Sequence, residues 1–99
     1  MIEITKDVFE EIISADEPTL VMFYADGCKP CGLMKNHLES IEIDHLDFMF
    51  CRMPASQADD FIPGTPTTVA YKAGRKVGML VGLKDKAAII KFLEEMRAA

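Results

Sequence analysis

Long apolar runs, an excess of basic residues and a dense set of cysteines are all absent from this sequence. Its apolar stretches are far shorter than the roughly 20 residues that a membrane-spanning helix requires, so we expect no membrane partner. Lys and Arg number 11 against 16 Asp and Glu, and the net charge of −5 disfavours binding to nucleic acid. Three cysteines are too few for a secreted domain held together by disulfides. The expected class is an ordinary globular protein.

The composition fits one such domain. With 99 residues and 49% hydrophobic side chains the chain can build a single core, so we expect one domain over residues 1–99. Met1–Asp7 contains neither a basic leader nor an apolar signal segment, which favours a cytoplasmic location. Cys51 lies in a run typical of a buried strand, and we interpret it as a small core side chain. A buried Cys51 cannot link two chains, so we expect a monomer.

Hydrophobic periodicity predicts alternating strands and helices. The expected strands are 2–4, 19–25, 46–53, 67–72 and 76–81. One expected helix follows the cap Thr5 and runs to about Ala15, a second runs from about Pro30 to Ile41, and a third follows the cap Asp85 and runs to Met96. A short helix or turn is expected at 55–61. Their apolar stripes are Val8, Phe9, Ile12 and Ile13; Leu33, Met34, His37, Leu38 and Ile41; and Ile89, Phe92, Leu93 and Met96.

The order of these elements predicts the topology. A strand–helix–strand unit lies parallel, whereas the short loop at 73–75 makes its two strands antiparallel. We therefore expect an α/β fold with a mixed central β-sheet and helices on both faces.

A pair of cysteines, Cys28-Lys-Pro-Cys31, stands where an apolar strand gives way to a helix. Two thiols at this spacing can face one another across one helical turn and close a short, reversible disulfide. The unpaired N–H groups and the positive end of the helix dipole favour the reactive thiolate. Pro30 suits the first turn because its missing N–H would be unpaired there anyway. The pattern predicts a redox pair.

A zinc site is an alternative use of two such cysteines. Zinc needs four ligands, and Cys51 with His37 or His45 would have to complete the set. Because Cys51 would then have to leave its strand, we expect no metal. We interpret His37, on an apolar stripe, as a packed helix residue and His45 as solvated.

Two stretches resemble the thioredoxin family. Phe23-Tyr-Ala-Asp-Gly-Cys-Lys-Pro-Cys31 is similar to its strand-to-helix active site, and Gly64-Thr-Pro-Thr67 to its cis-proline loop. The resemblance extends over nearly the whole chain and implies a thioredoxin-like fold. It implies a thiol-disulfide oxidoreductase, expected to be a reductase of protein disulfides, with an electron donor such as a thioredoxin reductase. It implies no cofactor beyond the redox-active disulfide.

The resemblance also assigns roles around the cysteines. Cys28, which precedes the helix, would be the exposed nucleophile, and the more shielded Cys31 would resolve the mixed disulfide. Asp26, Lys29 and Pro30 are expected to tune the redox couple. A Lys29 cation favours the Cys28 thiolate and the oxidising direction, and a nearby Asp26 carboxylate opposes it.

A second group of residues would bind the substrate. A cis Pro66 would pack against the disulfide, and the backbone of Thr65 would pair with an extended substrate segment like an added strand. Gly64 and Gly82 would leave room for its close approach.

Three positions depart from the family pattern. Gly27 stands where thioredoxins usually carry tryptophan, and Asn36 replaces a proline that often kinks the helix. Met22 occupies the position of a buried aspartate that assists proton transfer to the resolving thiol. Without that carboxylate, proton removal from Cys31 must rely on water or another group. These losses suggest a specialised or divergent member of the family.

Two other functions compete with this interpretation. One is a glutaredoxin-like, glutathione-dependent reductase, which the acidic chain disfavours because glutathione is an anion. The other is a non-catalytic binding module with the same fold. Retention of both thiols favours the enzyme, because a scaffold has no physical need for two thiols on one helical turn.

Overall fold

Five strands form one sheet in the computed structural model, which describes residues 1–99. In chain order the elements are β1 (Ile2–Glu3), α1 (Lys6–Ile13), β2 (Thr19–Tyr24), α2 (Lys29–Glu42), β3 (Met49–Pro54), the 3₁₀ helix η1 (Ala55–Gln57), β4 (Thr67–Lys72), β5 (Arg75–Val81) and α3 (Lys86–Ala98). The strands lie in the order β1-β3-β2-β4-β5. β3 runs parallel to β1 and β2, whereas β4 is antiparallel to β2 and β5, so the predicted mixed sheet is confirmed.

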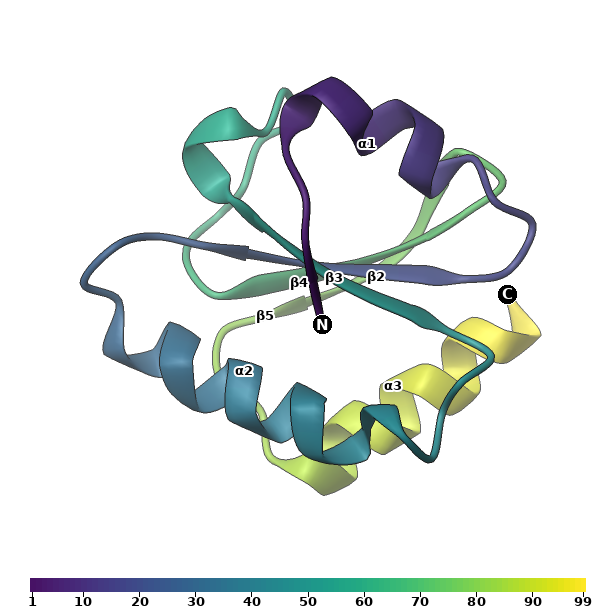
Figure 1. The fold of residues 1–99 in the computed structure, drawn as a ribbon. Helices are drawn as coiled ribbons and strands as arrows, with labels where there is room; N and C mark the ends of the chain where they lie inside the picture. The colour runs from purple at the N-terminus through teal and green to yellow at the C-terminus, as the bar shows by residue number, and fades with distance from the viewer.

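Helices cover both faces of the sheet, as the sequence predicted. In Figure 1, α1 lies on one side and α2 and α3 lie on the other. The carboxyl end of β2 leads directly into the turn before α2. The loop that precedes β4 approaches this same end of the sheet, which places two distant segments of the chain together.

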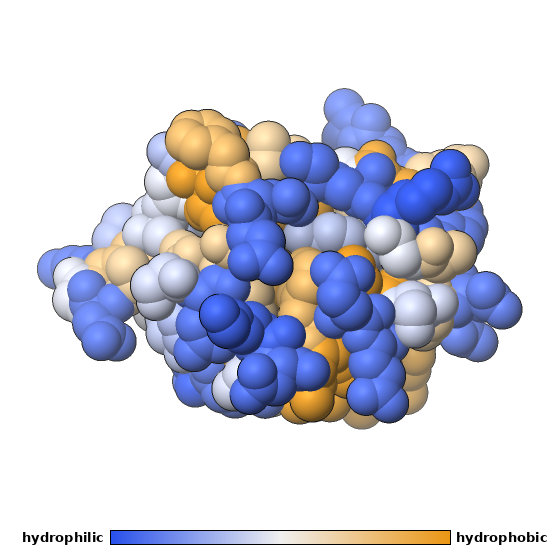
Figure 2. All heavy atoms as spheres, turned by 90° about the horizontal axis from the view of Figure 1, so that it is seen from above, coloured by the Kyte–Doolittle hydropathy of each residue, from blue (hydrophilic) through white to orange (hydrophobic).

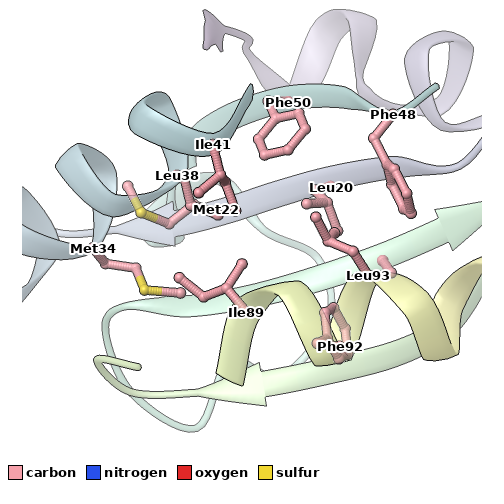
Figure 3. Packing of buried hydrophobic residues seen from close by; sticks show 11 residues of the cluster. Leu20, Met22, Met34, Leu38, Ile41, Phe48, Phe50, Ile89, Phe92 and Leu93 are labelled. Atoms are coloured by element: carbon pink, nitrogen blue, oxygen red, sulfur yellow. The ribbon is translucent and has the colours of Figure 1, made fainter. Parts of the chain in front are cut away.

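Alternating side chains of β2 divide between two apolar clusters. Leu20 and Met22 pack with α2 and α3, where Figure 3 shows them among the helix side chains. Val21 and Phe23 pack on the α1 side. All four are buried, because β2 is a central strand with both faces covered. Burial of both faces explains why this strand reads as a continuous apolar run.

The boundaries of β3 and the cap of α1 differ from the sequence predictions. β3 begins at Met49, and Leu46 is 74% exposed because it lies in a turn closed by the Phe48 N–H, which donates to the His45 carbonyl at 3.1 Å. Thr5 occupies the N-cap position of α1 without a side-chain hydrogen bond. The Gln57 side chain accepts from the Lys6 N–H instead, at 3.0 Å. By contrast, Asp85 caps α3 as predicted, since its Oδ1 accepts from Ala88 N at 2.8 Å.

Two members of the predicted apolar stripes face solvent. Val8 on α1 is 38% exposed and Leu33 on α2 is 45% exposed. Both stripes are narrower than the sequence pattern suggested. On α2 the buried apolar side chains after Cys31 are Met34, Leu38 and Ile41.

The outer surface matches the composition. Seen from the side of α1, the surface is largely hydrophilic and is interrupted by separate apolar groups (Figure 2). The longest helix, α2, has 14 residues, and none of the helices combines the length and hydropathy needed to cross a membrane.

Cys51 lies in the core, as predicted, and its thiol makes the stability of the protein depend on pH. It is 0% exposed, and burial raises the pKa of its thiol to about 11. In the unfolded chain a thiol ionises at about pH 8.5. Between this pH and about pH 11 the unfolded state therefore binds fewer protons than the folded state. We therefore expect this thiol's contribution to stability to be complete below that range and to fall by about 1 to 2 kcal/mol on raising the pH to about 10.

The measurement is denaturant unfolding of the disulfide-intact protein at neutral pH and at alkaline pH. The control is Cys51→Ala, which should show a smaller alkaline loss because it lacks the titrating thiol. Equal losses in the two proteins would assign the pH dependence to other groups.

Candidate active site

The turn between β2 and α2 places two cysteines at the start of a helix. Gly27 has a φ of +73°, a conformation that favours glycine, and it redirects the chain after the buried strand. Cys28 is the N-cap residue of α2, and its Sγ accepts from Cys31 N at 3.2 Å. The helix begins at Lys29, and Pro30 lies in its first turn, as predicted.

Cys28 and Cys31 form a disulfide across this first turn, with their Cα atoms 5.3 Å apart. Cys31 is 6% exposed, whereas Cys28 is only half-buried. The difference in access follows from position, because Cys31 belongs to the buried face of α2 and Cys28 lies at the helix end. An attacking partner therefore reaches Cys28 more easily than Cys31.

The loop before β4 lies against Cys28. The Thr65–Pro66 peptide bond is cis, which confirms the sequence prediction. Cys28 Sγ lies 3.5 Å from Thr65 Oγ1 and 3.6 Å from the Thr65 carbonyl oxygen. The Thr67 hydroxyl donates to the Gly64 carbonyl, and Gly82 N donates to the Pro66 carbonyl at 2.8 Å. These bonds fix the loop beside the disulfide.

Open space surrounds both predicted substrate-contact glycines. A Cβ atom built on Gly64 or Gly82 would meet no other heavy atom within 4 Å. Gly82 also has a φ of +87°, so a side chain there would strain the backbone. The structure thus brings Gly64, Thr65, Pro66 and Gly82 together, with Thr65 adjoining Cys28.

A cavity of about 190 Å³ lies beside the disulfide. Its lining residues are Met22, Tyr24, Ala25, Asp26, Gly27, Cys28, Cys31, Gly32, Lys35 and Arg52. Asp26 lines the same cavity as the two cysteines, and its tuning effect stays a prediction. Lys29 is exposed and outside this lining, and its tuning effect stays a prediction.

Tyr24, Lys35 and Arg52 are residues of this site that sequence reasoning missed. Lys35 follows Cys31 by four positions on α2, a spacing that places both on one helix face and could have identified it. Arg52 has no such signal, because its position opposite Met22 depends on the register of β3 against β2.

Arg52 and Tyr24 share one carboxylate. Arg52 Nε donates to Glu3 Oε1 at 2.9 Å, and the Tyr24 hydroxyl donates to Glu3 Oε2 at 2.6 Å. The Arg52 guanidinium also lies 5.3 Å from the centre of the Tyr24 ring. Burial and the hydrogen bond to Glu3 raise the pKa of Tyr24 to about 12, so the phenol stays neutral at physiological pH. Glu3 offsets the charge of Arg52.

The candidate zinc ligands are dispersed. Cys51 packs in the cluster on the α1 side, whereas Cys31 belongs to α2, which lies on the opposite side of the sheet. His37 Nδ1 lies 2.9 Å from the Lys84 carbonyl oxygen. His45 is half-buried, and Arg97 donates to its Nδ1 at 2.7 Å in an exposed contact. No group of three or more His, Cys, Asp or Glu side chains is arranged to hold a metal ion.

Comparisons with known proteins agree on one family. Residues 1–95 match the sequence profile of the family described as Thioredoxin. The chain is 32% identical over 94 residues to a thioredoxin of Streptomyces clavuligerus, covering 89% of this chain and 88% of that protein. A thioredoxin of Acidithiobacillus ferridurans is 31% identical, with 92% and 91% covered.

Solved structures and a fusion protein extend the comparison. The structure of Plasmodium falciparum thioredoxin superposes with a TM-score of 0.86 at 25% identity, covering 96% of this chain and 98% of that one. Chlamydomonas reinhardtii thioredoxin f2, at 22% identity with 100% and 98% covered, shares the fold with a TM-score of 0.87. A bifunctional thioredoxin reductase/thioredoxin of Mycobacterium leprae is 28% identical over 96% of this chain and 22% of its own length.

Proposed function

As this chain belongs to the thioredoxin family and is a thiol-disulfide oxidoreductase, we propose that it works as a reductase of protein disulfides, with Cys28 and Cys31 as its redox pair. The observation that carries the proposal is the disulfide in the first turn of α2, with the Thr65 hydroxyl next to Cys28 Sγ. The reaction proceeds within one domain, residues 1–99.

The proposed reaction has two exchanges. The Cys28 thiolate attacks one sulfur of a substrate disulfide, a Cys28–substrate disulfide forms, and the other substrate sulfur leaves as a thiolate that takes a proton from water. Cys31 then attacks Cys28 Sγ, which forms the 28–31 disulfide and releases the second substrate thiolate. Two electrons pass to the substrate. The greater exposure of Cys28 and the burial of Cys31 support this division of roles.

Electrostatics at the start of α2 support the first exchange. Cys28 is the N-cap residue, so the positive end of the helix dipole favours its thiolate. The Thr65 hydroxyl, 3.5 Å from Cys28 Sγ, can donate to that thiolate in the reduced protein. Lys29 at the start of α2 adds a cation and Asp26 in the preceding turn adds an anion, and we propose that these two and Pro30 tune the couple.

The proposed substrate is an extended segment of a protein. It lies across Gly64, Thr65 and Gly82, pairing with the Thr65 backbone beside cis Pro66. The open space at Gly64 and Gly82 supports this placement, because a close backbone approach needs positions without side chains.

A thioredoxin reductase is the proposed electron donor. The bifunctional thioredoxin reductase/thioredoxin of Mycobacterium leprae joins both functions in one chain, and this supports such a pairing. Glutathione is not favoured, because the relatives are thioredoxins. We further propose a cytoplasmic location and a monomeric state, the latter supported by the burial of Cys51, the one free thiol.

Rates of reduction of the oxidised protein test the choice of donor. We expect NADPH with a bacterial thioredoxin reductase to open the 28–31 disulfide and to sustain reduction of insulin. Reduced glutathione at matched reducing equivalents should open it at least about tenfold more slowly. Faster reduction by glutathione would contradict the proposed donor and favour the glutaredoxin-like alternative.

A further inference from the structure

The cavity beside the disulfide contains one cation with no ion-pair partner. Besides the cysteines, its ionisable side chains are Tyr24, Asp26, Lys35 and Arg52. Arg52 is paired with Glu3, and Tyr24 is neutral at physiological pH. Asp26 is exposed, so water screens its charge. Lys35 is half-buried and forms no salt bridge, which leaves its charge less screened and uncompensated.

Lys35 is placed to act on the resolving sulfur. Cys31 and Lys35 are separated by four positions on α2 and therefore lie on the same helix face. Long helical side chains lean back towards the preceding turn, which directs Lys35 towards Cys31. Because Cys31 is almost fully buried, the interaction between an ammonium and its thiolate is weakened less than at an open surface.

None of the other side chains around Cys31 is a fully buried base that could accept the proton of its thiol. Met22, an apolar side chain, faces the same cavity and is buried. Glu3 belongs to the neighbouring strand β1 and is already engaged by Arg52 and Tyr24. Among the ionisable side chains that line the cavity with Cys31, Lys35 is therefore the one with an unpaired positive charge.

We propose that Lys35 is a positioning residue for the resolving step, in which its ammonium stabilises the Cys31 thiolate. This role rests on the proposed function. In the step, the Cys31 proton passes to water, the Cys31 thiolate forms a bond to Cys28 Sγ, and the Cys28–substrate bond breaks. Its electron pair leaves on the substrate sulfur, which takes a proton from water.

The expected size of the effect follows from the partial exposure of Lys35. An opposite charge within about 4–6 Å changes the midpoint of ionisation by about 1 to 3 pH units, and partial hydration places Lys35 near the low end. Removing the charge should therefore raise the ionisation midpoint of the Cys31 thiol by about 1 pH unit. Because a more basic thiolate is also more nucleophilic, resolution at neutral pH should slow only about threefold.

The test uses protein with Cys28→Ser and Cys51→Ala, in which Cys31 is the one thiol left. Ultraviolet absorbance of the thiolate is followed against pH in this protein and with Lys35→Met, Lys35→Arg or Lys91→Met added. Met preserves much of the aliphatic stem, Arg restores the charge, and Lys91 is an exposed α3 lysine whose loss changes the net charge equally.

We expect Lys35→Met to raise the Cys31 midpoint by about 1 pH unit, and Lys35→Arg and Lys91→Met to leave it within about 0.3. Equal midpoints in Lys35→Met and Lys91→Met would overturn the proposal. Added salt provides a second measurement that needs no Lys35 variant. It should raise the midpoint in the protein that retains Lys35, and an insensitive midpoint would also count against the role.

These readouts do not depend on turnover. If the unmodified protein failed to reduce insulin while the Lys35 shift was observed, the proposed function would fail and the charge effect would stand. If the protein reduced insulin but no shift appeared, only the role of Lys35 would fail.

Discussion

Cys28→Ser protein is expected to lose insulin reduction by at least about 1,000-fold, because the serine hydroxyl cannot replace the attacking thiolate. The loss should be far larger than that of any change around the site, since every proposed turnover begins at this sulfur. The measurement is insulin reduction driven by NADPH and a bacterial thioredoxin reductase. Cys51→Ala is the matched control, because it also removes one thiol, on the opposite side of the sheet from Cys31, and should retain activity.

Cys31→Ser separates the two proposed roles. This protein keeps the attacking thiol and lacks the resolving one, so a Cys28–substrate disulfide should accumulate and be detectable by mass spectrometry. Turnover with Cys28→Ser comparable to that of the unmodified protein would refute the assignment of the nucleophile. Accumulation of a Cys31–substrate disulfide in the Cys28→Ser protein, with no adduct in Cys31→Ser, would reverse the two roles.

Leu38→Ala is expected to lower the free energy of unfolding by about 2 to 5 kcal/mol, a large part of the stability of a domain this size. Leu38 is 0% exposed and packs in the cluster between α2, α3 and the sheet, as Figure 3 shows. Truncation removes apolar contacts and leaves a cavity beneath the helix that carries the cysteines. The midpoint temperature of thermal unfolding should fall by roughly 10 to 20 °C.

Leu33→Ala is the control for this prediction. It makes the same chemical change in the same helix, but Leu33 is 45% exposed, so the loss should stay within about 0.5 kcal/mol. Chemical denaturation monitored by circular dichroism gives both values. Similar losses at Leu33 and Leu38 would contradict the packing of α2 described above.

Most of the fold could be predicted because its signals are local. The apolar run at β2 identifies a central strand, and Asp85 identifies the start of α3 through the cap that it provides. Leu46 was wrongly assigned to β3 because hydropathy does not report which carbonyl a turn N–H bonds. The apolar Leu33 was wrongly placed in the core for a related reason, since the width of the buried stripe depends on the surface that α2 covers.

The residues of the candidate site likewise include some that local motifs predict and others that only the three-dimensional structure brings together. The Cys28–Cys31 disulfide and cis Pro66 follow from short motifs, and the structure places them together. The Glu3–Arg52 pair lies beyond such motifs, because strand register brings together residues from opposite parts of the chain. Lys35 had a usable signal in its four-residue spacing from Cys31, but only the cavity shows that the two share an environment.

The most direct test of the central claim is the equilibrium reduction potential of the Cys28–Cys31 couple in a glutathione redox buffer. A reductase of protein disulfides requires a stable disulfide, so we expect a value near the thioredoxin reference of about −270 mV. The proposed effects of Lys29 and Lys35, which favour thiolate, would raise the potential above that reference. A value between about −120 and −180 mV would instead describe an oxidant or isomerase and would contradict the proposed direction.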